Sequence, residues 1–325
     1  MATFVRITIT VFAILNFISV RSQQTVQKFV LETNYLLSLP DHYNDDTTKR
    51  WPLLLFLHGS GESGSDVQKV KAHGPPQLAD QGKKFPFIIV SPQSPAPAGW
   101  DAELLYKLLQ NIKTIYRVDN QRIYLTGLSM GGYGTWDLAM KHPDEFAAIA
   151  PVCGGGDTTT AWKLRNISIW CFHGAKDDVV LPINSMNMVK AVKRYNPSVK
   201  FTLYPDANHN SWDSTYNSND NLYNWLLAQK KFVYKEIPQD INLLKKYEGH
   251  YVDSKKNTVK IIANAAGLVV IAPVNDTIPF KAAGENLFFI DADRTMDLYF
   301  TKSPAGITGF IFRGNDYQVF RKSGK

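Results

Sequence analysis

The chain has 325 residues, of which 44% are hydrophobic and 20% are charged, and its formal net charge is +7. This is an ordinary globular composition, and the length is enough for one large domain and a small one. The modest positive charge is unspecific, and no basic patch with interleaved aromatic residues is present. We therefore expect no nucleic-acid partner.

Residues 1–22 have the features of a secretory signal peptide. Arg6 precedes an apolar stretch from Ile7 to Val20, and Ser22 lies at a plausible cleavage position. The stretch is short and rather polar for a membrane span, and a retained anchor is the alternative. We therefore expect an exported protein, secreted or periplasmic, without integral membrane association.

From Trp51 to Leu227, strand patterns alternate with helix patterns. Apolar runs at 53–57 and 87–90 are typical of strands buried on both faces, and leucines and isoleucines at helical spacing follow over 104–115. Repeated units of this kind predict an α/β fold, with a doubly wound, mostly parallel sheet and helices on both faces. Further strands are expected at 122–126, 146–150, 168–172 and 201–204, and further helices at 132–142, 186–192 and 222–227.

The pentapeptide Gly127-Leu128-Ser129-Met130-Gly131 has the pattern G-x-S-x-G between an expected strand and an expected helix. A sharp turn of this kind lifts the serine hydroxyl above the sheet edge, where a base can reach it. This context predicts Ser129 as a nucleophile. The alternative is a passive serine in a glycine-rich turn.

Two adjacent aspartates, Asp177 and Asp178, follow the expected strand at 168–172. A serine alcohol is a poor nucleophile unless a base takes its proton and an acid orients that base. Either aspartate has the right place in the chain to be the acid. The alternative is a surface turn in which both carboxylates are solvated.

His209 lies in the loop after the last expected strand of the sheet, at 201–204. A neutral imidazole there could accept the Ser129 proton and donate to the acid. The order serine, aspartate, histidine is that of one established group of hydrolases. His209 is therefore the predicted base.

An oxyanion needs two preorganised backbone N–H groups. One is expected from Met130, the residue after the nucleophile. The other is expected from Ser60, in the glycine-containing loop after the strand at 53–57. In the same loop, His58 is interpreted as a structural anchor.

Residues 34–228 resemble secreted α/β-hydrolases of the carboxylesterase, feruloyl esterase and polyhydroxybutyrate-depolymerase-like group. The resemblance implies that the first aspartate of the H-G-x-x-D-x-x-V segment, Asp177, is the acid. The link from Asp157 to Ile167 is short, so we expect no cap domain and an open site. The matching segments, in chain order, are LLLFLHGSGESG, SPQ, IYLTGLSMGGYGTWDLA, APVCGGGD, FHGAKDDVV and YPDANHNSW.

Beyond residue 228 the pattern changes. Residues 229–240 include Pro238 and are interpreted as a linker between a catalytic domain at 23–228 and an accessory domain at 241–325. The accessory domain is vaguely similar to small β domains appended to some serine hydrolases, and no helical pattern is evident in it. Short strands expected at 259–262, 268–271, 287–290, 297–300, 309–312 and 318–320 predict a small antiparallel barrel or sandwich.

The two cysteines, Cys153 and Cys171, fall near the ends of strands that should be neighbours. They could pair in an oxidising compartment, but two buried apolar side chains are the favoured interpretation. Neither has metal-ligand spacing. We expect no metal and no cofactor.

These observations favour a secreted serine carboxylesterase that works through an acyl-enzyme, with feruloyl or acetyl esters of polysaccharide as the favoured substrates. Trp100 and Trp212 are expected to line the site, whereas Trp136 could equally belong to the core. Two alternatives stay open. One is a serine peptidase of the prolyl-oligopeptidase type, and the other is a non-catalytic protein that binds a glycan or another partner.

Overall fold

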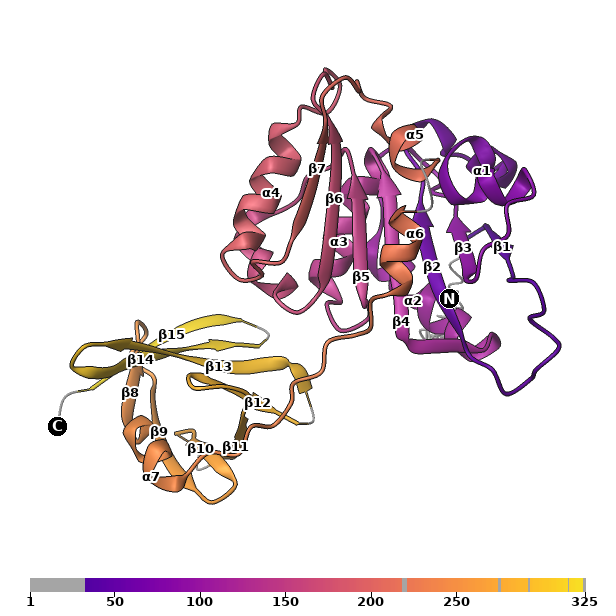
Figure 1. Ribbon diagram of the computed structural model, residues 1–325. Helices are drawn as coiled ribbons and strands as arrows, with labels where there is room; N and C mark the ends of the chain where they lie inside the picture. Colours follow the sequence, from indigo (N-terminus) through magenta and orange to yellow (C-terminus); the bar gives the residue numbers. More distant parts are fainter. Residues whose placement is uncertain (1–32, 218–220, 274–275, 292, 315, 324–325) are drawn as a thin grey trace, which may run out of the picture. The chain divides into compact units, whose positions relative to one another are not determined.

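A mixed seven-stranded sheet forms the first part of the molecule, in the order β1-β3-β2-β4-β5-β6-β7 (Figure 1). All neighbours are parallel except β1, which runs antiparallel to β3. The predicted α/β class is confirmed. The strands are β1 (Tyr35–Ser38), β2 (Trp51–Leu57), β3 (Ile88–Pro92), β4 (Val118–Leu128), β5 (Ala148–Val152), β6 (Ser168–Gly174) and β7 (Lys200–Tyr204).

The computed structural model describes residues 33–325 except 218–220, 274–275, 292, 315 and 324–325. The expected signal peptide, residues 1–22, lies outside the described residues. Of the helices that the structure describes, none combines the length and the apolar character that crossing a membrane requires.

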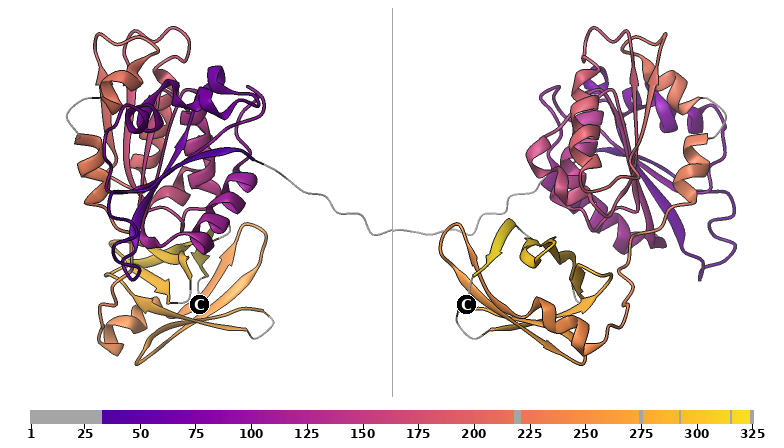
Figure 2. Two further views of the ribbon diagram at one scale, coloured as in Figure 1. Left: turned by 90° about the vertical axis from the view of Figure 1, so that its right-hand side faces the viewer. Right: turned by 60° about the vertical axis from the view of Figure 1, so that its left-hand side comes forward.

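Helices cover both faces of the sheet (Figures 1 and 2). In β2, Leu53, Leu55 and Leu57 join the apolar cluster that includes α2, α3 and α4, whereas Leu54 and Phe56 join the cluster on the other face with α5 and α6. This explains the continuous apolar run, because each strand residue meets a helical layer. The helices are α1 (Gly74–Asp80), α2 (Ala102–Ile115), α3 (Met130–Lys141), α4 (Ile183–Lys193), α5 (Ser211–Tyr216) and α6 (Asn221–Leu227), with 3₁₀ turns η1 (Ser60–Glu62), η2 (Val67–Ala72) and η3 (Thr158–Leu164).

Strand β1 and helix α1 are not among the elements expected from the sequence. β1 has four residues, none of them fully buried, so no apolar run marks it. α1 has seven residues and carries Pro75 and Pro76 in its first turn, the one place in a helix that tolerates proline. Both elements are too short for a recognisable hydrophobic period.

The C-terminal part is a closed antiparallel barrel rather than a sandwich. It closes where β15 pairs with β8, at Phe320↔Asp253 and Arg321↔Val252. Its interior is filled by aromatic rings, among them Phe288, Phe300 and Phe310. The strands are β8 (Gly249–Asp253), β9 (Thr258–Asn264), β10 (Gly267–Ile271), β11 (Thr277–Ala282), β12 (Leu287–Ile290), β13 (Asp293–Ser303), β14 (Gly306–Arg313) and β15 (Tyr317–Lys322).

Four elements of this part differ from expectation. A short helix, α7 (Ile241–Leu244), and a 3₁₀ turn, η4 (Lys245–Tyr247), precede the barrel, where no helical pattern was expected. Strands β8 and β11 were also not predicted. β11 contains Pro279, and a proline demotes a strand pattern because it cannot donate to the ladder.

Candidate active site

Ser129 lies at the turn between β4 and α3, as predicted. It is one of the few residues other than glycine with a positive φ, 53°, with ψ at −116°. Such a backbone is strained for a residue with a side chain and is typical of functional sites. The Ser129 N–H donates to the Val152 carbonyl at 3.0 Å, which ties the turn to the neighbouring strand.

Glycine at position 131 allows this turn to form. A Cβ on Gly131 would lie 2.0 Å from the Leu57 carbonyl oxygen, so only glycine lets α3 start so close to the end of β2. Gly127 is equally confined, because its Cβ would lie 2.4 Å from the Gly131 oxygen. Close backbone packing therefore explains why glycine occupies positions 127 and 131.

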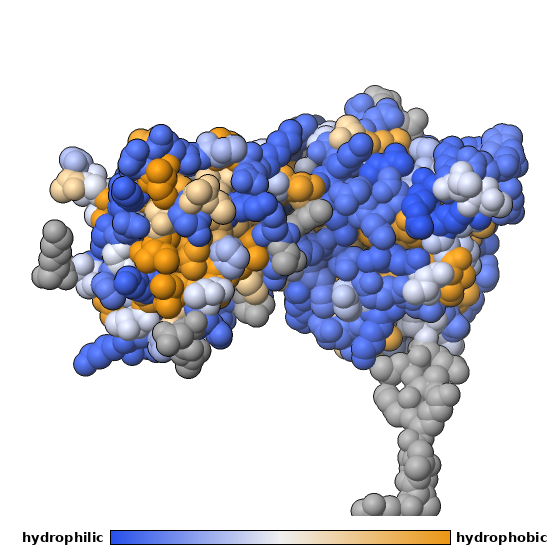
Figure 3. Space-filling model, turned by 90° about the horizontal axis from the view of Figure 1, so that it is seen from below, coloured by the Kyte–Doolittle hydropathy of each residue, from blue (hydrophilic) through white to orange (hydrophobic). Residues whose placement is uncertain are grey.

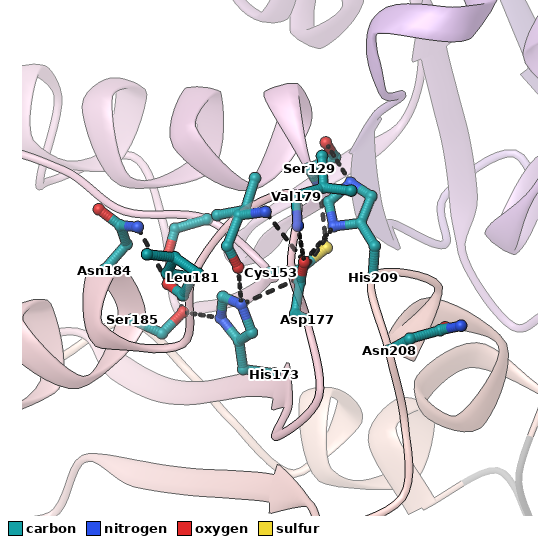
Figure 4. Close-up of polar contacts among 12 residues, drawn as sticks. Ser129, Cys153, His173, Asp177, Val179, Leu181, Asn184, Ser185, Asn208 and His209 are labelled. Carbon is teal, nitrogen blue, oxygen red and sulfur yellow. Dashed lines mark hydrogen bonds and ion pairs between the residues drawn. The ribbon is translucent and has the colours of Figure 1, made fainter.

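Three side chains form a hydrogen-bonded series at the carboxyl edge of the sheet (Figure 4). His209 Nε2 lies 3.0 Å from Ser129 Oγ, and His209 Nδ1 lies 2.8 Å from Asp177 Oδ2. Ser129 follows β4, Asp177 follows β6 and His209 follows β7. Parallel strands end at the same edge, so residues far apart in the sequence meet there. The contacts are those of a nucleophile, a base and an orienting acid.

Asp177 and Asp178 lie in different environments. Asp177 is 3% exposed, and its Oδ1 accepts from the backbone N–H groups of Val179 and Val180 at 3.0 and 2.9 Å. Asp178 is exposed. Burial alone would raise the pKa of the Asp177 carboxyl, but the hydrogen bonds from His209, Val180 and Val179 outweigh it and hold that pKa below its usual value.

The loop after β2 lies against the serine turn. A Cβ on Gly59 would be 2.9 Å from Leu128 Cδ1, so the backbone just before Ser60 packs on Leu128, the residue before Ser129. His58 anchors the loop, because its Nε2 accepts the Ser94 N–H at 3.0 Å. Ser60 and Met130, the expected oxyanion donors, thus belong to two adjoining segments.

Aromatic side chains flank the series. Trp100, Met130 and Tyr133 are among the residues that line a hollow of about 450 Å³. The Trp212 ring lies edge-on to His209, with centroids 5.2 Å apart. Trp136 is fully buried and belongs to the core. Tyr133 was not among the expected lining residues, although it is four residues after Ser129.

Two buried groups beside the site were not predicted. His173 Nε2 lies 3.1 Å from Asp177 Oδ2, and Cys153 Sγ accepts the Ser129 N–H at 3.3 Å. His173 opens the H-G-x-x-D-x-x-V segment, and this motif is the signal for it in the sequence.

Cys153, Asp177 and His209 place one potential metal-ligand atom each within 4.8 Å of one another. Each of the three is already hydrogen-bonded within the site: His209 to Ser129 and Asp177, and Cys153 Sγ to the Ser129 N–H. Burial raises the pKa of the Cys153 thiol to about 12. Cys153 and Cys171 are both buried and unpaired, as favoured from the sequence.

A sharp turn that carries a serine between strand and helix, on a mostly parallel sheet with an aspartate and a histidine after later strands, is the arrangement of the α/β-hydrolase class. Within this class, residues 99–231 match the model of the Dienelactone hydrolase family. A solved structure of a thermostable esterase is 33% identical, with a TM-score of 0.54, over 62% of this chain and 60% of that one.

Curated relatives are similar over the same region. A bifunctional acetylxylan esterase/xylanase from Neocallimastix patriciarum is 29% identical over 57% of this chain. A probable feruloyl esterase C from Aspergillus terreus is 27% identical over 46%, and a poly(3-hydroxyalkanoate) depolymerase C from Paucimonas lemoignei is 24% identical over 45%. The matches span 27%, 56% and 45% of those proteins' lengths. The predicted resemblance to this group of hydrolases is confirmed.

Proposed function

We propose that this protein is a serine carboxylesterase that hydrolyses carboxylic esters through an acyl-enzyme. The observation that carries the proposal is the 3.0 Å contact between Ser129 Oγ and His209 Nε2, made from a strained backbone turn at Ser129. The esterase relatives support the same reaction class.

In the proposed reaction, Ser129 Oγ attacks the ester carbonyl carbon while His209 Nε2 takes the hydroxyl proton. Asp177 keeps His209 Nδ1 protonated and stabilises the imidazolium that forms. The backbone N–H groups of Met130 and Ser60 stabilise the oxyanion. His209 then protonates the leaving alcohol, and a water molecule, activated by the same base, releases the acid.

We propose feruloyl or acetyl esters of polysaccharide as the substrates. Two relatives are named for acetylxylan and feruloyl ester cleavage, which supports this class. The hollow beside Met130, with Trp100 and Tyr133, offers aromatic surface to an acyl group, and the Trp212 ring lies next to His209. An exported protein with a signal peptide at 1–22, a catalytic domain at 23–228, a linker at 229–240 and an accessory domain at 241–325 fits an extracellular polymer as substrate.

The test is hydrolysis of p-nitrophenyl acetate, p-nitrophenyl butyrate and methyl ferulate by the wild type, Ser129→Ala and Ser198→Ala. Ser198 bonds to Asn196 and has no contact with the site, so its variant is the matched control. We expect Ser129→Ala to lower kcat by about 10⁴- to 10⁶-fold and Ser198→Ala to leave it unchanged.

A Ser129→Ala variant that keeps its activity would contradict the proposal. A wild type that hydrolyses none of the esters would also contradict it. In that case, labelling of Ser129 by a fluorophosphonate would support a serine peptidase, and absence of labelling would support a non-catalytic binding protein.

A further inference from the structure

The Asp177 carboxylate lies between two histidines (Figure 4). His209 contacts it from the side of Ser129. His173, on β6, contacts the same oxygen, Oδ2, at 3.1 Å and has no exposed surface. The mechanism described above uses one of these two histidines and leaves the other without a role.

The partners of His173 Nε2 determine which ring nitrogen carries the proton. Nε2 lies 2.7 Å from the Val180 carbonyl oxygen and 3.1 Å from Asp177 Oδ2. A carbonyl and a carboxylate are acceptors only, so Nε2 must carry a hydrogen, which these two oxygens share. His173 is therefore a donor to Asp177.

The other nitrogen of the ring is held by Ser185, on α4. His173 Nδ1 lies 2.7 Å from Ser185 Oγ, and Ser185 Oγ lies 2.7 Å from the Gly154 carbonyl oxygen. Burial lowers the pKa of His173, although contacts with Val180 and Asp177 oppose it. The Gly154 carbonyl is an acceptor only, so the Ser185 hydroxyl donates to it, and the Ser185 oxygen faces His173 Nδ1.

The other ionisable groups around His173 and Asp177 do not change their charge between pH 5 and 9. Tyr133, Cys153 and Cys171 are the other ionisable groups that act on Asp177, His173 or Ser185. Burial raises the pKa of each of them, to about 12 for both cysteines. All three are neutral between pH 5 and 9, so the net charge of this region is set by the histidines and Asp177.

We propose that His173, fixed by Ser185, is a positioning residue that orients the Asp177 carboxylate toward His209. Val179 and Val180 fix Oδ1 through backbone N–H groups, and His173 fixes Oδ2 through a side chain. With both oxygens fixed, the carboxylate cannot rotate away from His209. The inference rests on the proposed function, because Asp177 and His209 act in the reaction only if that function holds.

The experiment compares His173→Asn with His173→Gln. A glutamine amide places its nitrogen near the position of Nε2 and keeps a donor to Asp177, whereas an asparagine amide places it near Nδ1 and loses that donor. His142→Asn is the matched control, since His142 bonds to Glu103 and stacks on Tyr106, in contact with none of the site residues. The readouts are kcat, KM and the pH profile of kcat/KM on p-nitrophenyl acetate, and the rate of Ser129 labelling by a fluorophosphonate.

We expect His173→Asn to lower kcat and the labelling rate about 10²-fold with little change in KM, since the base is no longer held in line. Its acid limb should move to higher pH, because a carboxylate that has lost a donor presents more negative charge to His209. His173→Gln should restore most of the rate, and His142→Asn should change neither kcat nor the profile. Equal kinetics for His173→Asn, His173→Gln and the wild type would overturn the inference.

Two further measurements keep the inference testable if His173→Asn does not fold. Ser185→Ala should lower the labelling rate in the same direction, and ¹⁵N NMR of the wild-type imidazoles should show His173 protonated at Nε2. A ring protonated at Nδ1 alone would overturn the inference. A wild type without esterase activity would overturn the proposed function only, because the NMR result and the labelling rates report on His173 directly.

Discussion

The α/β domain and the barrel use their interiors differently. In the α/β domain, polar side chains such as His173, Asp177 and Ser185 are fully buried near the carboxyl ends of the strands. In the barrel strands, Asp297 is the one buried polar side chain among the described residues. It lies on the face of β13 opposite Leu298 and Phe300 and bonds to Arg165 and Tyr234, so the interior itself is apolar and largely aromatic. Burying polar groups costs free energy unless they are hydrogen-bonded. Their concentration near the carboxyl ends of the α/β strands therefore indicates a functional site there.

The surfaces differ in the opposite sense. On the face shown in Figure 3, hydrophobic residues gather on the barrel, at the left, and the α/β domain is mostly hydrophilic. Tyr299 and Val319 are exposed apolar side chains of the barrel strands, at 45% and 50%. Since the barrel interior is filled by its own rings, a binding role for the barrel would use its surface.

Replacing Asp177, the proposed buried acid, should have the largest effect on activity and is therefore the strongest test of the difference between the two interiors. Asp177→Asn keeps the shape of the side chain but no longer holds His209 in the productive tautomer, so we expect kcat on p-nitrophenyl acetate to fall about 10⁴-fold. Asp178→Asn, one residue further and exposed, should change kcat less than twofold. If the two variants lost equal activity, the assignment of the acid would be wrong.

A substitution in the barrel core should lower stability and leave kcat unchanged. Phe300 is 1% exposed and packs against Tyr247, Phe288 and Phe310, so Phe300→Ala should lower the free energy of unfolding by about 3–5 kcal/mol, measured by urea denaturation. The exposed neighbour variant Tyr299→Ala should cost within about 0.5 kcal/mol. Folded Phe300→Ala should keep its kcat, and a fall of kcat without unfolding would show that the barrel supports the site.

Lowering the pH should change the stability effect of a substitution in the polar interior of the α/β domain but not that of a substitution in the apolar barrel interior. The pKa of Asp177 lies below its ordinary value in the folded protein, so the stabilisation from its charge is present at neutral pH and is lost as the pH falls below about 4 through the folded pKa. The destabilisation by Asp177→Asn, measured by urea denaturation, should therefore be larger at pH 7 than at pH 3. That of Phe300→Ala should be the same at both pH values, because no ionisable group is removed. A constant effect of Asp177→Asn would contradict the charged, hydrogen-bonded carboxylate.

Much of the α/β domain could be predicted because its signals are local. The apolar runs of β2 and β3 are continuous, since each strand is buried on both faces. The turn at Ser129 needs glycine at positions 127 and 131 for reasons that lie within a few residues and the adjoining strand. Once the strands are parallel, the order of Ser129, Asp177 and His209 along the chain is enough to predict that they meet at one edge of the sheet.

Other features depended on contacts between distant residues, which only the tertiary structure decided. From the residues alone, Asp177 and Asp178 are equivalent, and burial with backbone donors separates them. The contacts from Gly154 through Ser185 to His173 join β6, α4 and the turn after β5, and no sequence spacing specifies them. The barrel closes through β8 and β15, more than sixty residues apart, so the short strand patterns predicted a β domain and left open whether it was a barrel or a sandwich.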